Sequence, residues 1–190
     1  NINLVTPTHF LEPVLGALGI AVKKGLKIPI VYNSGGYESV DTLKALDGII
    51  DVYLVDMRYG DDETAKKYSG IDNYVKVNQA VLVEMLRQTG PGGIIVRHLV
   101  LPGGLAGTEP VMHFISEKLS KDVYVSLMSQ YHPAYKATDY PLINRRIRRG
   151  EYDSAAEILL KYGLTNGWIQ SGLTEDVAKK FLGSGFESKA

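Results

Sequence analysis

The sequence predicts an α/β protein whose parallel strands form an open, partial (β/α) barrel of the TIM type. Strand-like runs alternate with helical patterns along the chain, and two of these runs are apolar enough for strands buried on both faces. The strands that can be counted are too few to close an eight-stranded barrel. No repeat or low-complexity linker divides the sequence, so we expect residues 1–190 to form a single domain.

The five predicted strands are short runs of residues that favour β-structure. They cover residues 1–5 (NINLV), 28–33 (IPIVYN), 49–55 (IIDVYLV), 92–102 (GGIIVRHLVLP) and 122–128 (DVYVSLM). Within them, IPIVY and IIVRHLVL are the two runs expected to be buried on both faces.

A helical spacing of apolar residues follows each predicted strand. The predicted helices cover residues 10–25, 37–46, 71–88, 108–119 and 151–163, and a polar turn is predicted at 61–68. Strands that alternate with helices of this length indicate right-handed βαβ units and a parallel sheet.

Composition narrows the classes of partner. Lys plus Arg and Asp plus Glu both number 21, so the net charge of zero predicts no attraction to nucleic acid or to an anionic membrane surface. No apolar run reaches the ~18 residues of a membrane span and no signal segment is recognisable, so we expect a cytoplasmic protein. The chain has no cysteine and only four scattered histidines, which predicts no disulfide, thiolate or zinc site.

The chain also reads as strand from its first residues and lacks an initiator methionine, which indicates a fragment.

In parallel α/β folds, ligands bind where the strands end and the following loops converge. The predicted strands end in five loops that are rich in glycine or hydrogen-bonding groups: 5–9 (VTPTH), 32–37 (YNSGGY), 55–62 (VDMRYGDD), 100–107 (VLPGGLAG) and 128–135 (MSQYHPAY). We interpret 100–107 as a structural loop, because it lacks a phosphate-binding motif.

Charged residues mark three of these strand ends. Asp56 and Arg58 are two residues apart, so they project to the same side of an extended chain. Arg97 interrupts an apolar strand and must pair with an anion, either Asp56 or a ligand carboxylate. His132 follows the last strand in a loop, where a functional histidine is more plausible than on a helix. His98 points to the opposite face from Arg97 and is interpreted as a structural histidine under a helix.

Two further loops have structural and functional interpretations. Thr6 and Thr8, on either side of a proline, are typical of helix N-capping. The stretch that contains Asn33 and Ser34 could be a plain turn, or its glycines could let a ligand approach the backbone closely.

Taken together, the stretches NINLVTPTHF, PIVYNSGGY, LDGIIDVYLVDMRYGDD, IIVRHLVLPG and LMSQYHPAY resemble radical S-adenosylmethionine (radical SAM) enzymes. The resemblance is to the iron-sulfur proteins similar to pyruvate formate-lyase activating enzyme, and it covers nearly the whole chain up to about residue 168. It implies a partial barrel that binds S-adenosylmethionine at a 4Fe-4S cluster held by a CxxxCxxC loop.

In such enzymes reductive cleavage of S-adenosylmethionine yields a 5′-deoxyadenosyl radical that abstracts hydrogen from a protein glycine or another substrate. The implied partners are therefore a protein of the glycyl radical enzyme kind and an electron donor such as flavodoxin or ferredoxin.

The resemblance also implies roles for individual residues. Asp56 and Arg58 match an Asp-x-Lys pair whose cation faces the methionine carboxylate, and Arg97 matches a strand arginine with the same task. His132 matches a loop histidine near the adenosyl ribose.

Two stretches depart from the family's pattern. Thr6 and Thr8 stand where the family carries a Gly-Gly-Glu motif that meets the methionine amino group. Asn33 and Ser34 stand where activating enzymes carry Asp-Thr beside a monovalent cation.

The largest departure is that the cysteine loop is absent from the sequence. The 190 residues alone are therefore expected to be inactive, with the cluster ligands outside them. Two alternatives stay open. One is a different partial-barrel lyase or isomerase that binds an anionic small molecule, and the other is a barrel remnant without catalytic activity that binds a partner.

Overall fold

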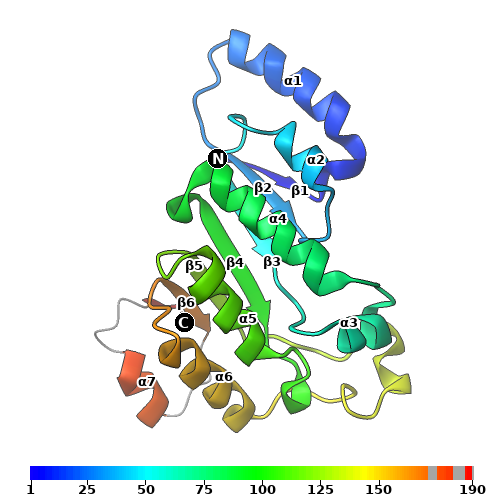
Figure 1. The fold of residues 1–190 in the computed structure, drawn as a ribbon, viewed down its shortest axis with the longest axis vertical. Coiled ribbons are helices and arrows are strands. Elements are labelled where there is room, and N and C mark those ends of the chain that lie inside the picture. Colours follow the sequence, from blue (N-terminus) through cyan, green and yellow to red (C-terminus); the bar gives the residue numbers. More distant parts are fainter. Residues whose placement is uncertain (171–174, 182–186, 190) are drawn as a thin grey trace.

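A parallel sheet forms the centre of the computed structural model, which describes residues 1–170, 175–181 and 187–189. Each strand pairs with the next strand along the chain (Figure 1). In order, the strands are β1 (Ile2–Val5), β2 (Ile30–Ser34), β3 (Val52–Asp56), β4 (Ile94–Leu99), β5 (Tyr124–Met128), β6 (Gly167–Gln170) and β7 (Glu187–Lys189). The order ends at β1 and β7, so the sheet is not closed.

The α/β class and the parallel sheet are thus confirmed, and all five predicted strands are present. The sequence reading missed β6 and β7. β6 (GWIQ) begins on a glycine, and β7 (ESK) contains no β-branched or aromatic residue, so neither stands out as a strand in the sequence.

Helices connect the strands, as expected for βαβ units. They are α1 (Leu11–Lys23), α2 (Val40–Lys44), α3 (Asp62–Ser69), α4 (Tyr74–Thr89), α5 (Thr108–Phe114), α6 (Arg149–Lys161) and α7 (Glu175–Phe181). The polar turn expected at 61–68 is wrong, because Asp61 caps a helix there by accepting a hydrogen bond from the Thr64 N–H at 2.7 Å. The predicted helix at 37–46 is shorter in the structure, because Glu38 bonds back to the Ser34 side chain and holds the preceding residues in a loop.

The sheet has one buried face and one half-exposed face. Alternate residues of β4 are buried, namely Ile94, Val96 and His98, whereas the residues between them are only half-buried. β2 shows the same alternation. In Figure 1, α4 and α5 lie on one side of the strands. The expectation that two strands would be buried on both faces is therefore wrong, and we call the half-exposed side the open face.

The hydrophobic core fills the space between the buried face and the helices. Its fully buried side chains come from every layer, including Tyr53 and Val96 of the sheet, Leu82 of α4, Met112 of α5 and Leu159 of α6. Burial of aliphatic and aromatic side chains on this scale is the main force that holds helices onto a sheet.

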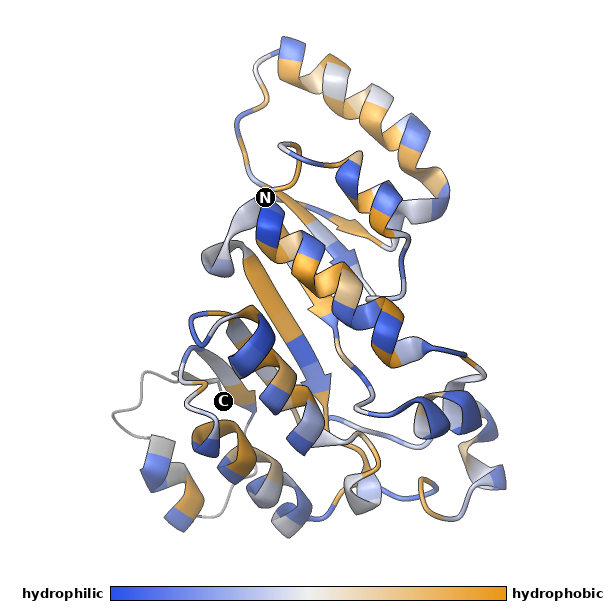
Figure 2. Cartoon of the chain, in the orientation of Figure 1, coloured by the Kyte–Doolittle hydropathy of each residue, from blue (hydrophilic) through white to orange (hydrophobic). Residues whose placement is uncertain are grey.

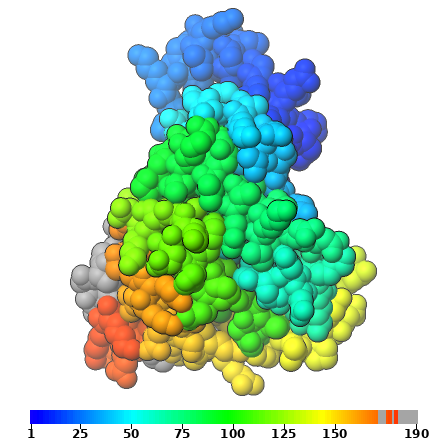
Figure 3. Space-filling view, in the orientation of Figure 1, coloured from blue at the N-terminus to red at the C-terminus, as the bar shows by residue number. Residues whose placement is uncertain are grey.

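The N-terminal helix α1 is poorly buried. No residue of α1 is buried, and the large apolar side chains of Phe10, Ile20 and Val22 are exposed. Figure 3 shows this segment standing out at one end of the molecule. Within the described ranges, α1 included, the structure has no helix with the length and apolar character needed to cross a membrane.

Candidate functional site

The C-terminal ends of β3 and β4 bring two charged residues side by side. Asp56 and Arg97 are direct partners in the β3–β4 register. Arg97 belongs to the half-exposed residues of β4, so both side chains lie on the open face. Figure 2 shows β4 changing from hydrophobic to hydrophilic toward this end. The sheet therefore places a polar site at its carboxyl edge, where ligands bind in parallel α/β folds.

One carboxylate holds two arginines. Asp56 Oδ1 accepts a hydrogen bond from Arg97 Nε at 2.6 Å, and Oδ2 accepts from Arg58 Nη2 at 2.9 Å and from Arg58 Nε at 3.2 Å. Arg97 Nη2 donates to Asn33 Oδ1 at 2.9 Å. The expectation that Arg97 pairs with an anion is confirmed, and of the two anions considered the structure shows Asp56. We call Arg58 and Arg97, held by Asp56, the arginine pair.

The charges in this cluster do not balance. Two guanidinium groups share a single carboxylate, which leaves one unit of positive charge at the site. The Arg58 side chain is 54% exposed and that of Arg97 25%, so both remain accessible to a ligand. Burial acts to lower the pKa of Arg58, but its hydrogen bonds to Asp56 and the charge of Asp56 outweigh burial and raise that pKa. An anion, and above all a carboxylate, is the ligand that such a pair attracts.

Helix α4 holds the strand ends that carry the arginine pair. The Tyr74 hydroxyl accepts a hydrogen bond from the Arg58 backbone N–H at 2.7 Å. One turn further along, Asn78 Nδ2 donates to the backbone carbonyls of Gly36 and Asp56, each at 2.9 Å. These two residues position the loops after β2 and β3 without facing the ligand side.

Sequence reasoning missed both of these α4 residues. Tyr74 and Asn78 are fully buried and lie four positions apart on the same face of the helix. A buried asparagine in an otherwise apolar helix stripe was the available signal, because a buried amide must find hydrogen-bond partners.

Thr8 and Ser34 belong to a second polar cluster. The Glu38 carboxylate accepts hydrogen bonds from Thr8 Oγ1 and Ser34 Oγ, each at 2.6 Å, and from the Tyr32 hydroxyl at 3.2 Å. The residues alternate along β2, so Ser34 points to the buried face while Asn33 points to the open face. The structure therefore separates these two neighbours. Glu38, the centre of the second cluster, was also missed.

Thr6 lies apart from both clusters. It is exposed, has a backbone φ of 47°, and makes no side-chain capping bond to the turn that follows it. The capping role expected of Thr6 is wrong. Thr8 bonds to Glu38 and Tyr32, so the structure brings neither threonine to the arginine pair.

His98 and His132 occupy different environments. His98 is fully buried, with Nδ1 at 2.7 Å from the Met57 carbonyl and Nε2 at 3.0 Å from Thr108 Oγ1. A carbonyl only accepts, so Nδ1 carries the proton and Nε2 accepts from the threonine. Burial lowers the pKa of His98 to about 4, and its interpretation as a structural histidine is confirmed. His132 is exposed and lines a cavity next to the arginine pair.

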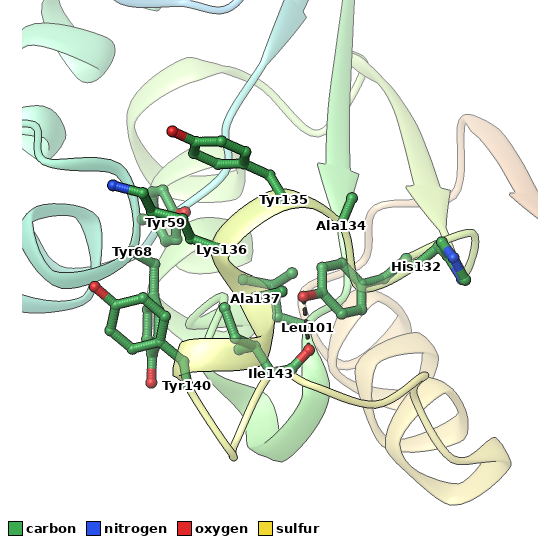
Figure 4. A pocket seen from close by; sticks show the side chains of 11 residues that line it. Tyr59, Tyr68, Leu101, His132, Ala134, Tyr135, Lys136, Ala137, Tyr140 and Ile143 are labelled. Atoms are coloured by element: carbon green, nitrogen blue, oxygen red, sulfur yellow. Dashed lines mark hydrogen bonds between the residues drawn. The ribbon is translucent and has the colours of Figure 1, made fainter.

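Two adjoining cavities open at this edge of the sheet. The first measures about 240 Å³ and contains the arginine pair and Asp56, with an apolar wall of Leu99, Leu101 and Met128. The second measures about 260 Å³ and is lined largely by tyrosines (Figure 4). Tyr59, Leu101 and Tyr131 belong to both linings. Together they fall within the range typical of small-molecule sites, ~300–1,000 Å³.

Metal ligands do not gather at this site. In the described ranges, no group of three or more histidine, cysteine, aspartate or glutamate side chains is arranged to hold a metal ion.

The chain is similar to a protein of uncharacterized function from Methanocaldococcus jannaschii. The two are 38% identical over 170 residues, which is 86% of this chain and 47% of that protein. The chain thus spans about half the length of the curated relative it matches. No protein-family model matches the sequence, and no solved structure matches it.

Proposed function

We propose that the chain is the S-adenosylmethionine-binding part of a radical SAM enzyme similar to pyruvate formate-lyase activating enzyme. The observation that carries the proposal is the arginine pair, which holds two cations against one carboxylate at the carboxyl edge of the sheet. Asp56 contacts both Arg58 and Arg97, the residues that the sequence resemblance assigns to a methionine carboxylate.

The residues of the site fit a carboxylate ligand. Arg58 and Arg97 bond to Asp56 and Asn33 through Nε and Nη2, so the Nη1 group of each takes no part in these bonds. We propose that these two groups bind the methionine carboxylate while Asp56 fixes the planes of both guanidinium groups. The apolar wall of Leu99 and Met128 would shield a bound carboxylate from water on one side, which strengthens the charge interaction.

A thiolate-ligated cluster does not fit the residues of this chain, because the sequence has no cysteine. The proposed activity is therefore that of a longer protein. In this class of enzyme, bound S-adenosylmethionine supplies a radical that abstracts hydrogen from a protein glycine or another substrate. The proposal includes a cytoplasmic location and an electron donor such as flavodoxin or ferredoxin.

We further propose that the sheet is part of an open barrel formed by a single domain. The unbroken order β1 to β7 supports this, because right-handed crossovers in that order leave the helices on one face. The open face, which carries the arginine pair, would then be the barrel interior.

Binding measurements test the proposal. Titration calorimetry should detect S-adenosylmethionine binding to the chain, and Arg97→Ala or Arg58→Ala should weaken it by ~1–3 kcal/mol, typical of a charge-assisted hydrogen bond. Arg87→Ala is the matched control, because Arg87 is also ion-paired but lies on α4. The analogue 5′-methylthioadenosine, which lacks the carboxylate, should bind the wild type and both site variants alike.

Other outcomes favour the alternatives. Unchanged affinity in both site variants would contradict the carboxylate assignment. Weak S-adenosylmethionine binding together with tight, Arg97-dependent binding of another carboxylate would favour a lyase or isomerase acting on an anionic small molecule. The observation that favours this second candidate, a lyase or isomerase, is the absence of cysteine from these residues.

A further inference from the structure

The second cavity has a composition that the arginine pair does not explain. Loops that follow β3, β4 and β5 surround it, and we call it the tyrosine pocket (Figure 4). Its lining consists of Tyr59, Tyr68, Leu101, Tyr131, His132, Ala134, Tyr135, Lys136, Ala137, Tyr140 and Ile143. Five of these side chains are tyrosines, and they come from two stretches far apart in the sequence, residues 59–68 and 131–140.

Four of the five tyrosine rings are held in place by contacts with other lining residues or with the adjoining helix α3. The Tyr59 hydroxyl lies 2.7 Å from Ser69 Oγ, and the Tyr131 hydroxyl donates to the Ile143 carbonyl at 2.8 Å. Tyr68 and Tyr140 pack edge to face, with ring centroids 5.2 Å apart. Because the hydroxyls of Tyr59 and Tyr131 are already bonded, these two residues offer the cavity rigid ring surfaces rather than free polar groups.

Charge distinguishes the kind of ring that would bind. The lining includes Lys136 and His132 but no aspartate or glutamate. Figure 4 shows the Lys136 amine on the side of Tyr59, Tyr68 and Tyr140, with His132 at the opposite end. A cage of aromatic rings can attract cations, but an adjacent lysine ammonium repels them. The pocket therefore suits a planar aromatic ring with a negative charge nearby.

We propose that the tyrosine pocket binds an aromatic ring of the substrate, one that carries an anionic group within reach of Lys136. Tyr59, Leu101 and Tyr131 separate the pocket from the arginine pair, so a ring bound here lies directly beside whatever the arginines hold. The identification of this ligand as a substrate rests on the proposed function. The binding of an aromatic ring in the pocket does not.

A matched pair of ligands tests the pocket. 3-Phenylpropionate and 3-cyclohexylpropionate share a carboxylate and differ in the ring, so calorimetry and ligand-observed NMR on the whole chain isolate the aromatic contribution. The phenyl compound should bind roughly three- to tenfold more tightly, the usual gain of an aromatic pair over area burial. Lys136→Met should weaken 3-phenylpropionate severalfold and leave 3-phenylpropionamide unchanged.

Variants of one residue distinguish the ring from its hydroxyl. Tyr131→Leu should abolish the preference for the phenyl compound, whereas Tyr131→Phe keeps the ring and should retain it. Tyr124→Leu alters an exposed tyrosine at the start of β5 and should have no effect. Circular dichroism confirms that each variant is folded.

Two results would overturn the proposal. One is equal affinity of the wild type for both ring compounds. The other is that Arg97→Ala loses 3-phenylpropionate binding while Tyr131→Leu keeps it, which would place the ligand on the arginine pair. Failure of S-adenosylmethionine to bind the wild type would instead refute the proposed function and leave an observed ring preference standing.

Discussion

Replacing Asp56 with Asn should destabilise the fold by about 2 kcal/mol, because it removes a charge and keeps the shape. A hydrogen bond that involves a charged group is worth ~1.5–3 kcal/mol, and the substitution would leave only one of the two partners charged, so the mostly buried bond from Arg97 should lose ~1–2 kcal/mol. The pair with Arg58 adds at most ~1 kcal/mol, since more than half of that side chain is exposed.

Urea unfolding followed by circular dichroism measures this loss. The urea concentration at the unfolding midpoint should fall without a change in the dependence of the unfolding free energy on urea. In a thermal scan the melting temperature should decrease by ~4–8 °C, as expected for a domain of this size. Asp72→Asn is the control, because Asp72 pairs with Lys66 where both side chains are largely exposed. Its loss should stay within ~0.5 kcal/mol. An Asp56→Asn variant as stable as this control would show that the Asp56 charge does not hold the arginine pair.

Three further predictions concern residues around the site. The pKa of His98 is lowered by burial to about 4 from the ordinary 6.5, so the unfolded state takes up the proton first and stability falls as the pH drops from ~6.5 toward 4. In urea unfolding at pH 7, 6 and 5, His98→Gln should lack this fall in the free energy of unfolding with decreasing pH. Gly36→Ala should lower the free energy of unfolding by ~2–4 kcal/mol in thermal unfolding, because φ is +75° and a Cβ would collide with Asn78 and the Asp56 carbonyl. The control Gly48→Ala has the same φ but open space around it, and should lose only ~1 kcal/mol. Glu151→Gln should speed amide hydrogen exchange at Gly103, because the Gly103 N–H donates to the Glu151 carboxylate at 2.7 Å. Unchanged exchange would contradict a role for this hydrogen bond in fixing the loop after β4.

Much of the sheet could be predicted from the sequence, because its strands are runs of β-branched and aromatic residues separated by helical spacing. That Arg97 pairs with an anion could also be predicted, with Asp56 as one of two candidates, since a guanidinium in an apolar strand needs an anion within reach. Both inferences use local patterns, and parallel register then brings the strand ends together.

Positions that depend on strand length or on distant partners could not be predicted. Asn33 and Ser34 were treated as one loop, but β2 continues through Ser34, so alternation sends their side chains to opposite faces. Thr8 and Glu38 meet only because the loops after β1 and β2 converge. Nothing within either loop specifies that partner.

The sequential strand order has a consequence for how the chain folds during synthesis. Each strand pairs with the one made just before it, so βα units can be added one at a time from the N-terminus, with no strand waiting for a distant partner. Until the next unit arrives, however, the newest strand is an unprotected edge. A chain interrupted after β4 would expose the backbone of Ile94–Leu99, the longest and one of the most apolar strands. Such truncated products should aggregate by strand addition, whereas a chain that extends through β5 protects this strand.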